Sequence, residues 1–204
     1  MVIDRKAFPR VADYLDALPE GIGSHPGCQT KASGYRASLE SRPLAEVALG
    51  GLPAPLGDLV RVPAVRNDWI PEVHAMAMGL AIADHHAMSD RLFLDWIYEV
   101  NRALLGGSTY GFLMTGGSGG ADPRRHSQLR WKQLHRGVEL ERKESLETSS
   151  RFAITFPRNL FSELLLLAFC RSFQASIELA CARGARVELD GFNELSAQFS
   201  ANWS

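Results

Sequence analysis

The chain is poor in features that would fix its class at once. It has three cysteines in 204 residues, too few for a disulfide framework. Cys170 and Cys181 fall on one predicted helix, about 16 Å apart at ~1.5 Å per residue, so they cannot bond within that helix. Cys28 stands alone in a polar loop. We therefore expect a reducing, cytoplasmic location.

Long apolar runs and an excess of charge are also missing. The longest apolar run, 164–170, is far below the ~20 residues needed to cross a bilayer. The first residues lead into an amphipathic segment rather than an apolar one, so we expect no signal peptide. The net charge is −1, and only Trp131 interleaves an aromatic ring with basic side chains, which argues against nucleic acid as a partner.

Recognisable catalytic motifs are absent as well. There is no GxSxG sequence. Cys28 lies near His25, but both fall in a loop rich in glycine and proline that holds no orienting acid. The glycine-rich loop 115–121 lacks the Lys-Ser/Thr of a phosphate-binding loop. The sequence therefore favours a protein that is not an enzyme.

The last third of the chain, 137–204, carries the strongest patterning. Period-two alternation over 138–141, 151–156, 187–190 and 197–203 predicts four strands of an antiparallel sheet with one apolar face. Between the two pairs, leucines and phenylalanines at helical spacing predict a long helix that follows Pro157, is capped by Asn159 or Ser162, and ends at Gly184. Turns are expected at 143–150 and around Asp190 and Gly191.

The first two thirds of the chain are predicted to be mainly helical. Helices are expected over 5–18, 30–41, 71–88, 89–106 and 122–137, with Trp69 and Ile70 as an apolar entry to the third. The proline-containing segment 52–63 is expected to be an ordered connector. The fold class is therefore α+β: a helical layer, 1–136, packed on a ββαββ core, 137–204, in one domain.

A metal site is the first candidate for chemistry. Asp84, His85 and His86, with Asp90 beyond, form the densest cluster of metal-ligating residue types, and His86 and Asp90 have a usable ligand spacing. The alternative is that these histidines mark a helix end favoured by the helix dipole.

A haem site is the second candidate. His74, Met78 and His85 fall on one face of the predicted helix 71–88, and histidine and methionine are residue types that ligate haem iron. The alternative is an ordinary helix seam with a satisfied imidazole. Cofactor identity thus stays open between haem, a metal ion and none.

Basic residues crowd the predicted helix 122–137, which has no acid after its capping Asp122. They are Arg124, Arg125, Arg130, Lys132 and Arg136. This helix could hold an anionic ligand or an acidic partner, or it could face the acidic strand that carries Glu139, Glu141, Glu144 and Glu147. The residues we assign to ligand binding are Trp69, His74, Met78, Arg124, Arg130 and Phe173.

The C-terminal pattern also resembles a known group of domains. The segments His135-Arg-Gly-Val-Glu-Leu-Glu, Phe152-Ala-Ile-Thr-Phe-Pro, Val187-Glu-Leu and Ala197-Gln-Phe-Ser-Ala-Asn-Trp look like the closing module of the vinyl-reductase-type ligand-binding domains. Haem nitric-oxide-binding domains and vesicle-tethering transport-particle subunits share that fold, and the nearest similarity is to a set of myxobacterial paralogues. The resemblance implies a helical layer over a sheet, a pocket for a small or lipid-like ligand, and a dimer.

Three functions follow as hypotheses. The first is a non-enzymatic sensory or adaptor domain that binds a small apolar or anionic ligand or a protein partner. The second is a metal- or haem-dependent protein that uses His74, His85, His86 and Asp90. The third is a structural subunit that forms homodimers through the apolar helix or through an edge strand that ends at Trp203.

Overall fold

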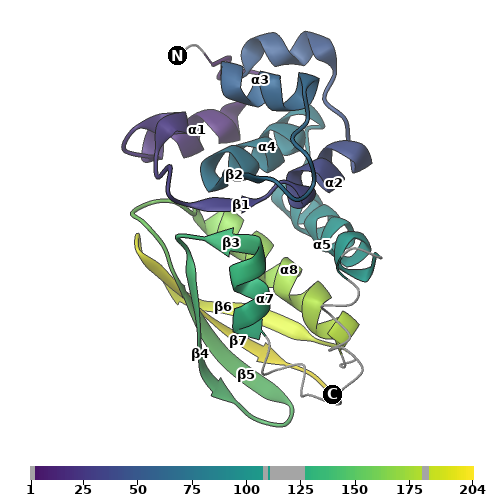
Figure 1. Ribbon diagram of the computed structural model, residues 1–204, viewed down its shortest axis with the longest axis vertical. Helices are drawn as coiled ribbons and strands as arrows, with labels where there is room; N and C mark the ends of the chain where they lie inside the picture. Colours follow the sequence, from purple (N-terminus) through teal and green to yellow (C-terminus); the bar gives the residue numbers. More distant parts are fainter. Residues whose placement is uncertain (1–2, 108–109, 111–126, 181–183) are drawn as a thin grey trace. The chain divides into compact units, whose positions relative to one another are not determined.

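The computed structural model describes residues 3–107, 110, 127–180 and 184–204, and Figure 1 shows its elements. The chain divides into two compact units, Met1–Phe93 and Leu94–Ser204. The combination of helices with antiparallel strands confirms the α+β class. The glycine-rich loop 115–121 and Arg124 lie outside the described residues.

Unit 1 is mainly helical. Its elements in chain order are α1 (Pro9–Ala17), η1 (Gly21–Gly23), β1 (Gln29–Lys31), α2 (Ser33–Ser41), η2 (Glu46–Gly51), α3 (Ala54–Arg61), β2 (Trp69–Pro71) and α4 (Glu72–His85). Helices α1, α2 and α3 all pack against α4. Along α4, Val73, Ala77 and Met78 have no exposed surface. The burial of α4 by three neighbours explains why its sequence is apolar on more than one side.

Unit 1 corrects three of the expected elements. Residues 52–63 are not a connector, because they contain helix α3; its prolines sit at the N-cap and in the first turn, where no backbone N–H is missed. The expected helix 30–41 begins as strand β1, and α2 starts only at Ser33. Trp69 and Ile70 form strand β2, in which Ile70 lies opposite Thr30 of β1 in an antiparallel pair.

Helix α5 (Asp90–Gly106) confirms the helix expected over 89–106, and the boundary between the two units falls inside it. Helix α7 (Ser127–Leu134) is the described part of the basic helix. It ends earlier than expected, because His135 and Arg136 form the short strand β3 before Gly137 takes a left-handed φ of 71°.

Unit 2 contains the predicted ββαββ module. Strands β4 (Glu139–Ser145), β5 (Ser149–Thr155), β6 (Arg186–Phe192) and β7 (Ser196–Asn202) form one antiparallel sheet in the order β4-β5-β7-β6. Helix α8 (Glu163–Ala180) contacts β6 and β7 and lies along one face of this sheet (Figure 1). Ile154, Ala197, Phe199 and Ala201 are 0–1% exposed, so they form the centre of this core.

Details of the module differ from the prediction. Asp190 and Gly191 are not a turn but a bulge within β6; the turn follows at residues 193–195, where Asn193 accepts backbone hydrogen bonds from Leu195 and Ser196. Gly184 has the expected left-handed φ of 64°. The strand that approaches Trp203 is β7, which lies between β5 and β6, so the expectation that it forms an edge is wrong.

Candidate functional site

The most distinctive site in unit 2 is a cluster of six rings. They are Trp131, His135, Phe152, Phe169, Phe173 and Phe199, here called the Trp131 cluster. They come from α7, β3, β5, α8 and β7, which places the cluster between two helices and the sheet. The period-two strands and the helical spacing in α8 bring these rings to one side of the sheet.

Trp131 and His135 form the end of the cluster nearest α7. Their rings stack with centroids 4.0 Å apart, and the Trp131 indole N–H donates to the Val138 carbonyl at 2.8 Å. Phe169 and Phe173 of α8 lie 5.7 and 5.8 Å from Trp131. Because its polar N–H is satisfied, Trp131 can be 7% exposed without an unpaired donor.

Phe173 joins the two ends of the cluster. Its ring meets Phe152 edge-on at 4.7 Å and Phe199 at 5.5 Å, and Phe152 stacks on Phe199 at 5.3 Å. Phe199 is 1% exposed, whereas Phe152, Phe173 and His135 are only half-buried. The cluster therefore combines a closed apolar interior with three rings that still reach solvent, an arrangement suited to holding an apolar group.

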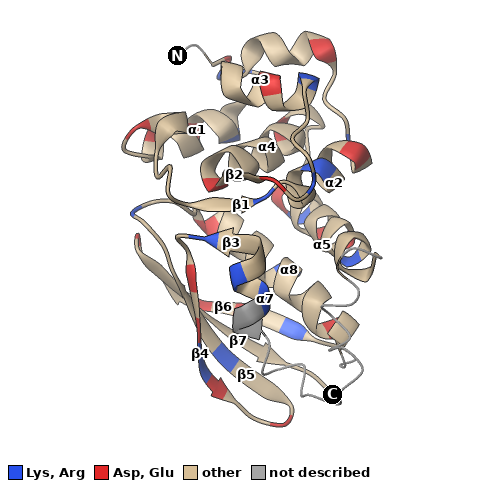
Figure 2. Cartoon of the chain, in the orientation of Figure 1, with Lys and Arg blue, Asp and Glu red and all other residues tan. Residues whose placement is uncertain are grey.

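Arg130 is a cation on the helix that carries Trp131. It precedes Trp131 on α7, and two of its guanidinium nitrogens, Nε and Nη2, are buried. Lys132 and Arg136 are exposed. Two of the four acids that were expected to face this helix pair with other residues: Glu141 with Lys143 at 2.6 Å and Glu144 with Arg151 at 4.0 Å. Figure 2 shows charges of both signs along β4.

Polar links between α8 and α5 lie elsewhere in unit 2. Arg171 of α8 bonds Asp95 of α5, and Tyr98 donates its hydroxyl proton to Glu178. That hydrogen bond raises the pKa of Tyr98. These contacts connect the two helices, and none of the four residues belongs to the Trp131 cluster.

Three predicted ligand-binding residues lie in unit 1. Trp69 is half-buried in β2, with the Lys31 ammonium 4.1 Å from the centre of its ring. Met78 has no exposed surface and is part of the packed face of α4. His74 is half-buried; burial lowers the pKa of its imidazole, and a hydrogen bond with the Ile22 backbone acts in the opposite direction. Of the predicted ligand-binding residues, Arg130 and Phe173 occur in the other unit, where Phe173 contacts Trp131 and Arg130 precedes it on α7.

The structure does not assemble the proposed metal ligands. Asp90 is paired with Arg10 at 2.8 Å, and His86 Nε2 lies 3.2 Å from the Pro43 carbonyl. His85 contacts the His86 ring edge-on at 5.0 Å. Within residues 3–107, 110, 127–180 and 184–204, no group of three His, Cys, Asp or Glu side chains is arranged to hold a metal ion.

Asp84 has a different role from the one its neighbours suggested. Its side chain has no exposed surface. One carboxylate oxygen accepts from the backbone N–H groups of Arg10 and Val11, at 2.9 and 3.3 Å, at the start of α1. The other accepts from the Arg10 guanidinium at 3.1 Å. Burial raises the pKa of Asp84, and these hydrogen bonds oppose the rise.

Three buried ionisable groups also meet in unit 1. Glu72 is 0% exposed, and its charge raises the pKa of the neighbouring Tyr14 and Cys28 in addition to the effect of burial. Burial brings the pKa of Cys28 to about 11, so its thiol stays protonated at neutral pH and is a poor nucleophile. The pairing of Cys28 with His25 thus gains no support as a catalytic arrangement.

Sequence reasoning did not identify the Trp131–His135 stack or the role of Arg10. The sequence indicated the stack only weakly: Trp131 and His135 lie four residues apart in the expected helix 122–137, and residues at that spacing face the same way. Nothing in the sequence near Arg10 indicated its role, because its partner Asp84 is 74 positions away.

Comparison with solved structures identifies the class of fold. The chain resembles an H-NOX domain carrying two phenylalanine substitutions, with a TM-score of 0.55 and 10% identity over 85% of this chain and 95% of that one. It also resembles an oxygen-binding H-NOX domain related to soluble guanylate cyclases, solved as the oxygen complex, with a TM-score of 0.50 and 10% identity over 84% of this chain and 92% of that one. The fold is therefore that of H-NOX domains.

A third structure, from work on haem distortion in the H-NOX family, matches with a TM-score of 0.50 and 11% identity over 85% of this chain and 92% of that one. No family model and no curated protein matches the sequence. At these identities the likeness establishes the fold and leaves the function to the side chains of this chain.

The side chains of unit 1 can be compared with what haem iron requires of a protein ligand. Haem iron takes an axial imidazole that is neutral and held in place by a hydrogen bond from its other ring nitrogen. Burial lowers the pKa of His74, which favours its neutral form, and its imidazole hydrogen-bonds the Ile22 backbone. By its donor chemistry, therefore, His74 fits an axial ligand.

Proposed function

We propose that this chain is a non-enzymatic sensory domain that binds a small apolar or anionic ligand at the Trp131 cluster. The half-buried state of Phe152, Phe173 and His135 supports this most directly, because these rings adjoin a closed aromatic interior yet remain reachable from solvent. The buried guanidinium nitrogens of Arg130, the residue before Trp131 on α7, add a positive charge on the same helix. Aromatic walls with few polar groups are the usual lining of small-molecule sites.

The likeness in fold is compatible with this role. One of the similar structures is an oxygen-binding domain related to soluble guanylate cyclases, so the same architecture carries ligand binding in that protein. In the adaptor form of the proposal, a protein partner binds at the same surface. We further propose a cytoplasmic location, which the buried thiols of Cys28 and Cys170 support. No helix among the described residues could span a membrane.

Native mass spectrometry of the protein purified from its host tests the ligand-binding proposal. We expect a retained small molecule, or a stable partner, on the wild-type chain. Phe173→Ala should lose it, because Phe173 touches both ends of the Trp131 cluster. Phe192→Ala is the matched control, since Phe192 is 48% exposed on β6 and should keep the ligand. Protein that is free of ligand and partner would overturn the proposal.

Haem binding through His74 is a second candidate function. The half-buried, backbone-bonded imidazole of His74 and the H-NOX fold favour it together. When bound, haem would supply iron that binds a gaseous ligand; His74 would hold the iron. His86 and Asp90 are exposed and His85 is half-buried, and these three residues remain a proposed metal site.

Haem reconstitution and elemental analysis separate these candidates. If the haem proposal holds, the reconstituted chain shows a Soret band that His74→Ala abolishes and His86→Ala preserves. A spectrum without a Soret band, or one that His74→Ala leaves unchanged, would reject His74 as the ligand. Stoichiometric metal that is lost in His86→Ala would instead support the metal site. These readouts do not depend on ligand binding at the Trp131 cluster.

A further inference from the structure

The sheet of unit 2 has two edge strands, β4 and β6, and they differ in character. Strand β4 carries charges of both signs along its length, has a bulge between Arg142 and Glu144, and is packed against α7. A bulge within a strand and a helix packed against it are two means by which an edge is kept from pairing. Strand β6 also carries charges of both signs, but its bulge lies only near its end, between Leu189 and Gly191, so residues 186–189 form a regular edge.

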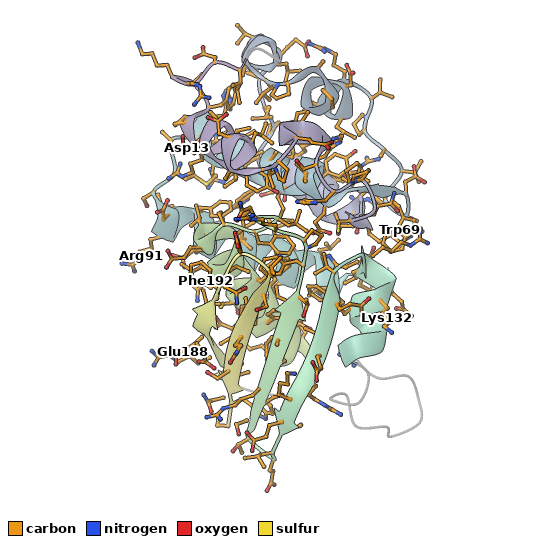
Figure 3. All side chains as sticks on the ribbon, turned by 90° about the vertical axis from the view of Figure 1, so that its left-hand side faces the viewer. Asp13, Trp69, Arg91, Lys132, Glu188 and Phe192 are labelled. Atoms are coloured by element: carbon orange, nitrogen blue, oxygen red, sulfur yellow. The ribbon has the colours of Figure 1, made fainter. Side chains whose placement is uncertain are left out.

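The side chains of β6 alternate strictly between the two faces of the sheet. Arg186, Glu188 and Asp190 are exposed, whereas Val187 and Leu189 are half-buried on the face that α8 covers. Figure 3 shows Glu188 at the margin of the sheet. Arg186 and Glu188 are 79% and 50% exposed and pair with each other at 2.8 Å within the strand, so pairing with a second strand would exchange this contact for two contacts between subunits.

The order of charges on β6 is complementary to itself. In a two-fold antiparallel pair centred on Val187, Arg186 lies opposite Glu188 of the partner subunit, and this pair occurs twice. Val187 then lies opposite Val187 of the partner subunit, on the face of the sheet that α8 covers. A pair centred on Glu188 would place Arg186 opposite Asp190 of the partner subunit, but it would also oppose the two Glu188 side chains and would include the bulge at Asp190. A centre at Leu189 would oppose Glu188 to Asp190 of the partner subunit, so charge selects the Val187 centre.

We propose that the homodimer forms by antiparallel pairing of β6 with β6 of a second copy, with the two-fold axis at Val187. The pairing joins two four-stranded sheets into one, and it brings two α8 helices side by side because α8 lies over β6. A strand pair alone buries less than the roughly 1,200–2,000 Å² of a stable interface, so the proposal also requires a contact between the two α8 helices. This surface is independent of the Trp131 cluster, so either proposal can fail alone.

Charge reversal tests the register. Wild-type protein should sediment as a dimer at micromolar concentration, and Arg186→Glu and Glu188→Arg should each raise the dissociation constant at least tenfold, because each opposes like charges twice. The double variant R186E/E188R restores both pairs and should dimerise like the wild type. Arg151→Glu on β5, where Arg151 is 71% exposed, is the control and should not change the association.

Crosslinking supplies a second measurement. In a Cys181→Ser background, Val187→Cys should form a disulfide between subunits on oxidation, because directly opposed Cα atoms lie within the ~4.4–6.8 Å range of disulfides. Leu189→Cys, two positions from the axis, should not. A wild-type monomer at 100 μM, a double variant that fails to dimerise while still folded by circular dichroism, or crosslinking at Leu189→Cys in place of Val187→Cys would each overturn the proposal.

Discussion

Asp84, at the end of α4, caps the start of α1 and binds the Arg10 side chain with the same carboxylate. The cap comes from a distant residue because α1 has no capping side chain of its own: its N-cap is Phe8, and Pro9 follows. Arg10 Nη2 also donates to the Met88 carbonyl at 2.8 Å, and the same guanidinium reaches Asp90. One arginine therefore ties α1 to the end of α4 and to the start of α5.

The first prediction concerns this contact. Asp84→Ala should lower the free energy of unfolding of unit 1 by about 2–3 kcal/mol, because it removes a helix cap and leaves part-buried Arg10 without its buried partner. Asp84→Asn should cost less, since its amide oxygen can still cap α1. Urea titration followed by circular dichroism measures both. Asp16→Ala removes an exposed pair with Arg5, and it should cost under about 1 kcal/mol; equal effects at the two sites would refute the assignment.

The second prediction is a pH dependence that originates at His74. Burial lowers its pKa in the folded state, so the unfolded chain binds a proton more readily as the pH falls through about 6.5. Stability should therefore fall between pH 7.5 and pH 5, and part of that fall should vanish in His74→Gln. Thermal unfolding at a series of pH values measures it. The exposed His86→Gln should keep the wild-type slope; an unchanged slope in His74→Gln would show that His74 is not the group responsible.

The third prediction concerns the two described cysteines. Cys28 and Cys170 are 3% and 4% exposed, and burial raises their pKa to about 11 and about 12. With Cys181 replaced by serine, native protein at pH 8 should react with a thiol reagent roughly 100-fold more slowly than the unfolded chain, since few thiolates form. Spectrophotometric titration with and without denaturant checks this, and a fast native reaction would contradict the burial of these thiols.

The fourth prediction concerns the interior of the Trp131 cluster. Phe199→Ala should destabilise unit 2 by about 3–5 kcal/mol, because it opens a cavity beneath Phe152 and Phe173. Phe192→Ala, on the exposed end of β6, should change stability by less than about 1 kcal/mol. Urea unfolding monitored by tryptophan fluorescence compares them. Similar losses for the two variants would mean that the cluster is not the core of unit 2.

The prolines of α3 show one limit of prediction from sequence. Pro53 and Pro55 favoured a connector, because proline interrupts most helices, yet both occupy the one part of a helix that accepts them. Whether such prolines mark a connector or the start of a helix depends on whether the residues after them are buried against the rest of the protein. Leu56 is 0% exposed, and the local sequence pattern does not predict this burial.

The sequence by itself determined the ββαββ module. Apolar residues repeat every second position in its strands and at helical spacing in α8, and such local periods persist wherever the chain is placed. Only the tertiary structure decided which strand lies at the edge, which rings meet at Trp131, and that Asp84 binds Arg10. These depend on pairings between distant segments, and a pairing leaves no mark on the sequence of either partner alone.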